Sequence, residues 1–307
     1  MKHLLCAILL LSALAIRAEV AGLGKGEEPP SMYELTARSD LVVKVQIVSG
    51  SLKRAQVRVL DVFRGTARPG QDLEIAFRDL NTSLGKEDRI VFVDGESEAL
   101  FLVPELDSEE KPRGGNRYTL TRGRFGRVVL PREGEDIYLD AIREFARLVA
   151  LKDHRELFNR LKGLLQSQNP ILVDAGLTEV LKLDLVDREL APEIMGFYND
   201  PAPKRRLAAL KLMRRLFSDF KDRESHPEFK ESVLPPVIVL ARNDPEETVR
   251  VAAVDALGAW GGATVTETLK EIARQDSAQA VRYEAQLVLL RAQGQEAPKT
   301  PPAVKSP

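Results

Sequence analysis

Aspartate and arginine recur at matching positions in three stretches of the chain, and these residue types form ion pairs or bind charged ligands. In each stretch an arginine follows an aspartate by six residues, and apolar residues follow at fixed offsets. The three pairs are Asp200 and Arg206, Asp244 and Arg250, and Asp276 and Arg282. A period of about 20 to 50 residues is the signature of stacked repeats. The pattern therefore predicts an array of similar helical units.

A second group of charged residues lies in the glycine-containing segment 113–127, where arginines accompany Tyr118 and Phe125 on a predicted hairpin. These arginines are Arg113, Arg117, Arg122, Arg124 and Arg127. One interpretation is a surface for an anionic partner, such as a lipid head group, a polysaccharide or an acidic protein face. The interpretation that we favour is an edge hairpin whose charges prevent pairing with other sheets.

Residues for catalysis or metal binding are sparse. His154 and His226 each lack a second histidine or cysteine nearby, whereas a zinc site needs three or four such ligands. Cys6 is the only cysteine, and no nucleophile-elbow, zinc-protease, P-loop or dinucleotide-binding pattern occurs. We therefore expect no catalytic, cofactor-binding or metal site, and a protein that is not an enzyme. The net charge of -1 gives no reason to expect nucleic acid as a partner.

The first residues have the order of a secretory signal peptide. Lys2 and His3 precede an apolar run over residues 4–16, and Ala18 offers a small residue for cleavage. The run is shorter than the roughly 20 residues of a membrane-spanning helix, although a retained anchor is the alternative. Exported eukaryotic domains commonly carry disulfides, and this chain has a single cysteine. We therefore expect a bacterial protein of the periplasm or the medium, without a membrane span after cleavage.

Residues 39–133 predict a small antiparallel β-barrel. Runs of β-branched residues alternate with turns that contain glycine and proline, and Val57 and Val59 alternate with Gln56 and Arg58 as in a half-buried strand. The predicted strands cover 41–48, 55–63, 72–77, 89–93, 99–103, 117–121 and 125–130.

Residues 137–293 have a helical period and predict about nine helices. Several helices begin where Asn or Asp precedes proline, which combines a capping side chain with a residue that needs no hydrogen-bond partner for its nitrogen. We expect Gly176 to interrupt one helix and Pro235-Pro236 to kink another. The predicted fold class is multidomain α+β. Its parts are a signal peptide 1–18, a flexible lead-in 19–38, the barrel 39–133, an α-solenoid 137–293 and a disordered proline-rich tail 294–307.

The segment 244–276 resembles a HEAT repeat of the short type related to the phycobilisome lyases. The matching residues are the opening Asp244, then Val249-Arg250, Ala253, Ala256-Leu257-Gly258, Leu269, Ile272 and the next Asp276. The resemblance extends over roughly 137–292 and implies a solenoid of helix pairs. It also implies that the recurrent Asp and Arg residues form a structural ladder between repeats. The alternative is a row of arginines that faces an anionic ligand.

The strands from residue 39 to 75 resemble the opening of netrin-like domains, whose barrel is of the oligonucleotide-binding (OB) type. Tissue inhibitors of metalloproteinases, which carry this barrel, reach a protease zinc through an N-terminal cysteine. Here the expected mature N-terminus is Glu19, which excludes inhibition by that route.

Together these patterns predict an exported, non-enzymatic scaffold that binds a protein or peptide through its solenoid. One alternative is an enzyme or enzyme subunit, because short HEAT repeats occur in bilin lyases. Another is a structural protein of the cell envelope that uses the arginine-rich hairpin and the tail. The single tryptophan, Trp260, is expected to pack between helices rather than to contact a partner.

Overall fold

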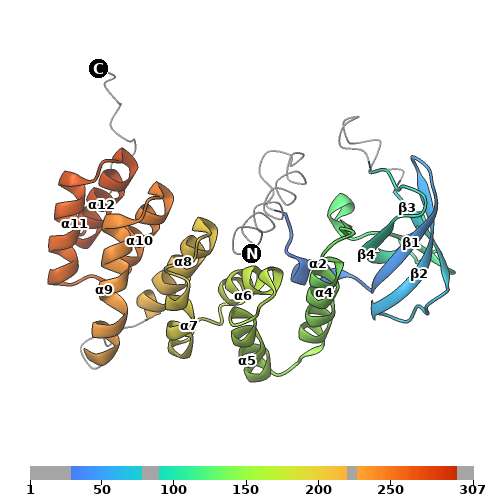
Figure 1. Ribbon diagram of the computed structural model, residues 1–307, viewed down its shortest axis with the longest axis horizontal. Coiled ribbons are helices and arrows are strands. Elements are labelled where there is room, and N and C mark those ends of the chain that lie inside the picture. The colour runs from blue at the N-terminus through green and yellow to red at the C-terminus, as the bar shows by residue number, and fades with distance from the viewer. Residues whose placement is uncertain (1–28, 78–89, 220–226, 296–307) are drawn as a thin grey trace, which may run out of the picture. The chain divides into compact units, whose positions relative to one another are not determined.

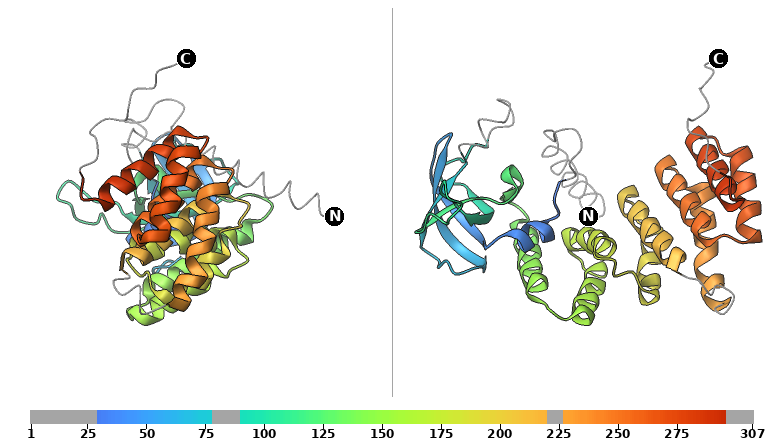
Figure 2. Two further views of the ribbon diagram at one scale, coloured as in Figure 1. Left: turned by 90° about the vertical axis from the view of Figure 1, so that its left-hand side faces the viewer. Right: turned by 180° about the vertical axis from the view of Figure 1, so that it is seen from behind.

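The computed structural model describes residues 29–77, 90–219 and 227–295 (Figures 1 and 2). The chain forms two compact units that divide between Leu151 and Lys152. The first unit holds all the described strands, and the second holds the helices from α5 onward. The predicted multidomain α+β fold is therefore confirmed.

Five strands of the first unit close a barrel, drawn in blue to green in Figure 1. They follow the cyclic order β1–β2–β3–β5–β4, because β4 pairs back onto β1. Closure removes the open edges that a flat sheet of this size would present, and it fits the OB-like barrel that the sequence predicts. The strands are β1 (Leu41–Gly50), β2 (Arg54–Arg64), β3 (Asp72–Ala76), β4 (Ser97–Pro104) and β5 (Arg117–Leu120), with a short β6 (Arg127–Val129) that also pairs with β4.

Alternation of residue type along the strands decides which side chains fill the barrel. Along β2, Val57 and Val59 are buried, whereas Gln56 and Arg58 are exposed. Successive side chains of a strand point to opposite faces, so every second residue enters the core. The other strands contribute Val43, Val45, Ile47, Leu73, Ile75, Leu100 and Leu102 to the same core.

Two expectations for the barrel are wrong. It is not wholly antiparallel, because β3 and β5 run parallel, with Ile75 opposite Tyr118. The strand predicted at 89–93 is absent over residues 90–93, and residue 89 lies outside the described residues. Ile90 and Phe92 are nevertheless buried in the barrel core. The apolar alternation there reflects burial without strand pairing, which periodicity alone does not distinguish.

The hairpin predicted within segment 113–127 is also wrong. β5 and β6 both pair with β4, at Leu102–Pro104 and at Glu98–Leu100, and are not paired with each other. Between them a turn of 3-10 helix (η2, Gly123–Gly126) follows Arg122, whose φ of 54° is left-handed. This turn preserves the direction of the chain, so the two strands follow one another along the same neighbour.

Two helices pack beside the barrel within the first unit, namely α2 (Met32–Arg38) and α4 (Glu135–Ala150). Leu35 of α2 and Ile142 of α4 share an apolar cluster with Phe101 of β4. The last part of the predicted flexible lead-in is therefore helical. Helix α4, which the sequence assigned to the solenoid, belongs to the barrel unit, because its apolar face is buried there.

The second unit contains eight described α-helices and one 3-10 turn (η3, Arg188–Leu190). Asn169 caps α6 by accepting from the N–H of Ile171, with Pro170 as the first helical residue. Within the described ranges, no helix has the length and apolar character needed to cross a membrane. The helices are α5 (His154–Leu165), α6 (Pro170–Lys182), α7 (Ala191–Gly196), α8 (Pro203–Asp219), α9 (Pro227–Asn243), α10 (Glu247–Trp260), α11 (Ala263–Gln275) and α12 (Gln279–Ala292).

Gly176 does not interrupt helix α6, contrary to expectation. A Cβ atom at this position would lie 3.1 Å from Cβ of Leu164 and 3.0 Å from Cδ2 of Leu165, both in α5. The glycine therefore marks a close approach between two helices. Pro235 and Pro236, where the sequence predicts a kink, both lie inside helix α9.

Candidate functional site

Arg206 of α8 and Asp244, which precedes α10, form a buried ion pair. Nε and Nη2 of Arg206 donate to Oδ2 and Oδ1 of Asp244 at 2.8 and 2.9 Å. Nη1 donates to the carbonyl oxygen of Asp200 at 2.8 Å. Only 9% of the Arg206 side chain and 2% of the Asp244 side chain are exposed. Hydrogen bonding to the Asp244 carboxylate raises the pKa of the Arg206 guanidinium, which keeps the pair ionised.

The same arrangement recurs one repeat further along. Nε and Nη2 of Arg250 donate to the Asp276 carboxylate at 3.0 and 3.1 Å, and Nη1 donates to the carbonyl oxygen of Asp244 at 2.8 Å. Oδ1 of each aspartate also accepts the N–H two residues on, at the start of the next helix. The structure thus brings together Arg206 with Asp244 and Arg250 with Asp276. We call these two pairs the closed rungs.

The end members of the pattern have different surroundings. Asp200 lies 3.4 Å from Nη1 of Arg205, whose Nε donates to Asp174 at 2.6 Å. Arg282 keeps the backbone bond of the closed rungs, since its Nη1 donates to the carbonyl oxygen of Asp276 at 2.6 Å. Among the described residues, no carboxylate accepts from its Nε and Nη2. We call Arg282 the open rung.

Small residues let the first helix of each repeat approach the next. Ala209, Ala253 and Ala285 occupy the same offset in α8, α10 and α12, and each is fully buried. A Cβ atom on Gly258 would lie 2.5 Å from Cγ1 of Val288, so α10 and α12 touch at this point. Helix α10 packs against both α8 and α12. In Figure 1 the colours run from yellow at α8 through orange at α10 to red at α12. Contact of each unit with its neighbours is the geometry of a solenoid.

A family model described as HEAT repeats matches residues 196–290. This part of the chain is a HEAT-repeat array. It runs from α7 into α12, so it contains both closed rungs and the open rung. HEAT arrays are generally interaction scaffolds, because stacked repeats present extended surfaces to other proteins. A comparison with curated proteins found no match for the chain.

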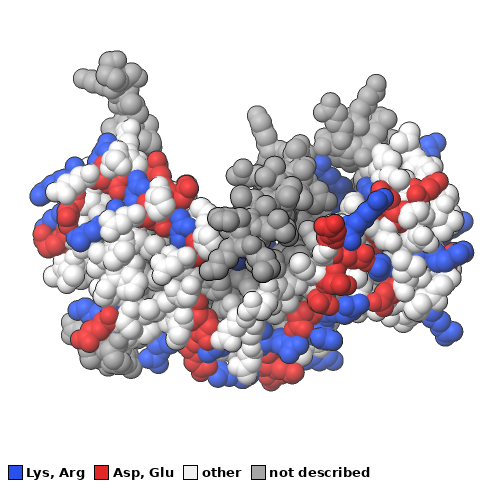
Figure 3. Space-filling view, in the orientation of Figure 1, with Lys and Arg blue, Asp and Glu red and all other residues white. Residues whose placement is uncertain are grey.

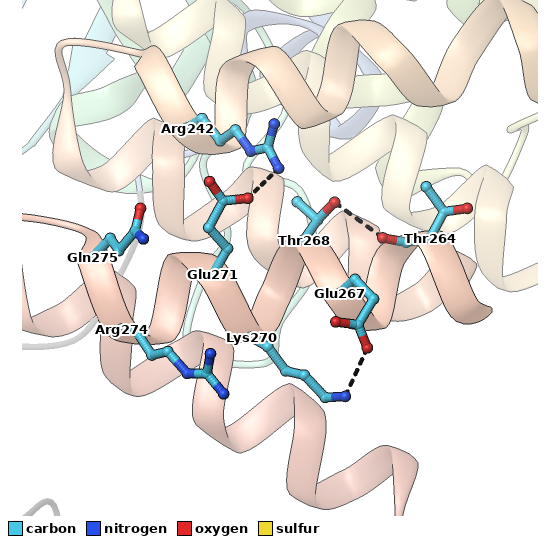
Figure 4. Close-up of a pocket in the computed structure, with 8 residues that line it drawn as sticks. All are labelled: Arg242, Thr264, Glu267, Thr268, Lys270, Glu271, Arg274 and Gln275. Carbon is cyan, nitrogen blue, oxygen red and sulfur yellow. Dashed lines mark hydrogen bonds and ion pairs between the residues drawn. The ribbon is translucent and has the colours of Figure 1, made fainter.

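The second helices of the HEAT array line a hollow of about 410 Å³, shown in Figure 4. Nη2 of Arg242, in the last turn of α9, lies 2.5 Å from Oε2 of Glu271 in α11. Nζ of Lys270 lies 2.7 Å from Oε1 of Glu267. Small-molecule pockets are mostly apolar with few polar groups. A hollow walled by charged and threonine side chains therefore suits the polar surface of a protein. Its lining consists of Arg242, Thr264, Glu267, Thr268, Lys270, Glu271, Arg274 and Gln275.

An exposed apolar side chain lies one turn away from this hollow. Val239 of α9 is 56% exposed and precedes Arg242 by three residues, so the two share a face of the helix. We call Val239 and the lining of the hollow the α9–α11 surface. Figure 3 shows acidic and basic side chains interspersed over the visible face of the HEAT array. The surface thus combines an apolar contact with a polar surround, as protein interfaces do.

Sequence reasoning missed the α9–α11 surface. Val239 lies in the apolar run 237–241, which reads as core, and the residues of α11 show only an ordinary polar helix face. No motif marks them, because the hollow depends on the spacing of α9 and α11, both of which contact α10.

Arg127, one of the five arginines of segment 113–127, neutralises a buried carboxylate. Its Nε donates to Oε2 of Glu98 at 2.6 Å, and the Glu98 side chain is fully buried. The guanidinium also lies 4.8 Å from the ring centroid of Phe92. This pair crosses from β6 to β4 and has no short-range sequence signal.

The other four arginines of that segment do not share one face of a hairpin. Arg113 and Arg117 lie 3.8 and 4.0 Å from the carboxylates of Glu105 and Glu74. Arg124 lies over the Phe125 ring, and Arg122 is exposed where the chain enters η2. The five are therefore spread over a loop, two strands and a turn.

The sequence also singled out His154, His226 and Trp260. His154 begins α5, and His226 lies outside the described residues. The described ranges contain no group of three or more His, Cys, Asp or Glu side chains that could hold a metal ion. Trp260 is 3% exposed and meets Phe217 edge to face, with ring centroids 4.8 Å apart. Its packing role agrees with the favoured interpretation.

Proposed function

We propose that this protein is an exported, non-enzymatic scaffold that binds a protein partner through its HEAT array. The observation that carries the proposal is the α9–α11 surface, which lies on a segment matched as HEAT repeats. Desolvated apolar contacts supply most of the affinity at such interfaces, while surrounding charges set orientation and specificity. Val239 provides the apolar contact in this proposal.

The charges of the hollow favour a partner segment with acidic character. Three cationic side chains, Arg242, Lys270 and Arg274, lie beside two carboxylates, Glu267 and Glu271. Arg242 and Lys270 each pair with a glutamate, whereas no ion pair of Arg274 occurs among the described residues. Exposed charges of this kind contribute little affinity individually but select against like charge.

Export is supported by the order of residues at the N-terminus, which lies outside the described residues. A basic start, a short apolar run and Ala18 match what a signal peptidase recognises. Expression of the whole chain in a bacterial host should yield a periplasmic product. Its intact mass should be that of a chain whose first residue is Glu19. A full-length product retained in the cytoplasm would contradict export and leave the binding proposal standing.

Photo-crosslinking tests the binding surface directly. A benzophenone amino acid replaces Val239 in one protein and Val129 in another, because both valines are exposed and they lie in different units. Exposed to the periplasmic extract of its host, the protein labelled at 239 should form a discrete adduct that the protein labelled at 129 does not form.

Point variants then measure the contribution of the surface. Val239→Asp and Arg274→Glu should each weaken binding of the crosslinked partner about tenfold, which corresponds to roughly 1.4 kcal/mol. Val129→Asp serves as the matched control and should leave the affinity unchanged. Equal affinities for all three variants would reject the α9–α11 surface, and turnover of a substrate by the purified protein would reject a non-enzymatic role.

A further inference from the structure

Arg282 repeats the backbone bonds of the closed rungs, but no carboxylate of the described residues contacts it. Its Nη1 donates to the carbonyl oxygens of Asp276 and Ser277, as Nη1 of Arg250 does to those of Asp244 and Pro245. In both closed rungs the remaining nitrogens, Nε and Nη2, donate to the carboxylate of an aspartate that precedes the first helix of the next repeat. The bonds to backbone carbonyls therefore hold the Arg282 guanidinium at the equivalent position. Its Nε and Nη2, which we call the fork, have no acceptor among the described residues.

The surroundings of Arg282 favour an anion. The residue lies in the first turns of α12, which begins at Gln279. The N-terminal end of a helix carries a partial positive charge, so a cation is unfavourable there unless a carboxylate accompanies it. Each closed rung supplies that carboxylate, whereas at the open rung no described residue does.

The helix face that carries Arg282 differs from its counterparts in one further respect. Four residues after the ladder arginine, α8 has Leu210 and α10 has Val254, and both are fully buried. At the same offset α12 has Gln286, which is exposed. A polar outer face is typical of a terminal repeat in a solenoid. Another identical repeat would bury Gln286, so this face suits a partner that makes a polar contact.

We propose that Arg282 is a docking point for an aspartate that opens a helix in a protein partner. The carboxylate would accept from Nε and Nη2 of Arg282 in the bidentate geometry of the closed rungs. The inference rests on the proposed function, since it presumes a protein partner, and it names a second contact on the same HEAT array.

Residues 296–307 of this chain are a poorer candidate for the carboxylate donor. The segment lies outside the described residues and contains one acidic side chain, Glu296, against two lysines, Lys299 and Lys305. Neither the charge balance nor a helix-opening aspartate matches what the closed rungs use. A variant truncated after Gln295 tests whether residues 296–307 contact Arg282.

Nuclear magnetic resonance of the arginine Nε–Hε groups in the full chain tests the proposal. The probe is a synthetic peptide with the sequence of residues 276–292, which opens with an aspartate and has helix-forming residues. The Arg282 signal, assigned by its loss in Arg282→Lys, should move saturably during the titration. The signals of Arg206 and Arg250 should not move, because their forks are occupied.

Two matched controls measure how selective the fork is. A peptide with asparagine in place of its opening aspartate should bind at least tenfold more weakly. Arg282→Lys keeps the charge but loses the planar fork, and it should weaken binding of the aspartate peptide severalfold. A small aspartate derivative, N-acetylaspartate methylamide, provides a probe that needs no helix and should move the same signal.

The proposal is overturned if both aspartate probes leave the Arg282 signal in place, or if Arg274 and Arg291 respond as strongly. Equal binding of the asparagine peptide would also overturn it. So would a shift of the Arg282 signal on truncation after Gln295, because the tail would then fill the fork.

A comparison of partner binding separates this inference from the proposed function. A partner that binds through Val239 but is indifferent to Arg282→Gln would leave the proposed function standing and reject the role of Arg282. Failure to recover any partner would count against the proposed function, while the peptide titration still decides whether the fork takes a carboxylate.

Discussion

At the scale of single residues, burial decides what each charged side chain does. Arg206 and Arg127 belong to patterns that read as possible anion-binding groups, yet each is committed to a carboxylate inside its unit. Arg282 has the same position in its repeat as Arg206 and is only half-buried. The same residue type at the same offset is therefore structural in one repeat and available for contact in another.

Removal of a closed-rung arginine should destabilise the HEAT array strongly. Arg206→Ala leaves the buried Asp244 carboxylate without its partner, and breaking a buried pair in this way costs about 3–5 kcal/mol. The matched variant Arg282→Ala removes no ion pair among the described residues and should cost less than about 1 kcal/mol. Urea unfolding followed by circular dichroism measures both. Equal losses for the two variants would show that the closed rung is not the source of stability.

The Arg127–Glu98 pair should behave in the same way within the barrel. Arg127→Ala removes the bidentate cation from the fully buried Glu98 carboxylate, with an expected cost of about 3–5 kcal/mol. Arg122→Ala, at an exposed arginine of the same segment, should change the free energy of unfolding by less than about 0.5 kcal/mol. Thermal denaturation of the two variants decides the matter. If Arg127→Ala is as stable as the parent, a structural role for Arg127 is rejected. The interpretation of these arginines as a surface for an anionic partner is then favoured.

At the scale of elements, close helix contacts depend on the absence of a side chain. Gly258 brings α10 against Val288 of α12, as Gly176 brings α6 against α5. Glycine inside a helix costs roughly 1 kcal/mol relative to alanine. The lower helix propensity of glycine is therefore offset at these positions by closer packing between helices.

Gly258→Ala should destabilise the HEAT array by about 1–3 kcal/mol, because the new methyl group would overlap Val288. Gly163→Ala in α5 meets open space and should stabilise by up to about 1 kcal/mol. In a Val288→Ala background the penalty of Gly258→Ala should disappear. Denaturant unfolding of this double-mutant cycle gives the measurement, and an unchanged penalty would place the strain elsewhere.

At the scale of the whole molecule, the chain consists of two compact units that divide near Leu151. Each unit has its own apolar core and its own buried ion pairs. Units with separate cores generally unfold separately unless a large apolar interface couples them.

We therefore expect two transitions in scanning calorimetry of the mature chain. Arg127→Ala should lower the midpoint of one transition, and Arg206→Ala should lower the midpoint of the other. A single transition that both variants shift by the same amount would show that the two units unfold as one.

Much of the fold follows from local patterns in the sequence. Val57 and Val59 alternate with polar neighbours and form a strand, and Asn169-Pro170 starts a helix as its capping chemistry requires. The recurrence of Asp and Arg at fixed offsets is also local, so the repeat can be recognised from the sequence of the segment that matches HEAT repeats. Local propensity and period are properties of a short segment, which is why they are readable without a structure.

The tertiary structure alone decided which groups meet across long sequence separations. Ile90 and Phe92 have the alternation of a strand but fill the core without pairing, and α4 has the period of a solenoid helix but packs beside the barrel. The α9–α11 surface also depends on how whole helices are spaced. Such spacing results from packing and burial summed over many residues, so no short segment encodes it. The sequence by itself thus determined the repeat, and the packed structure decided which carboxylate each of its buried arginines contacts.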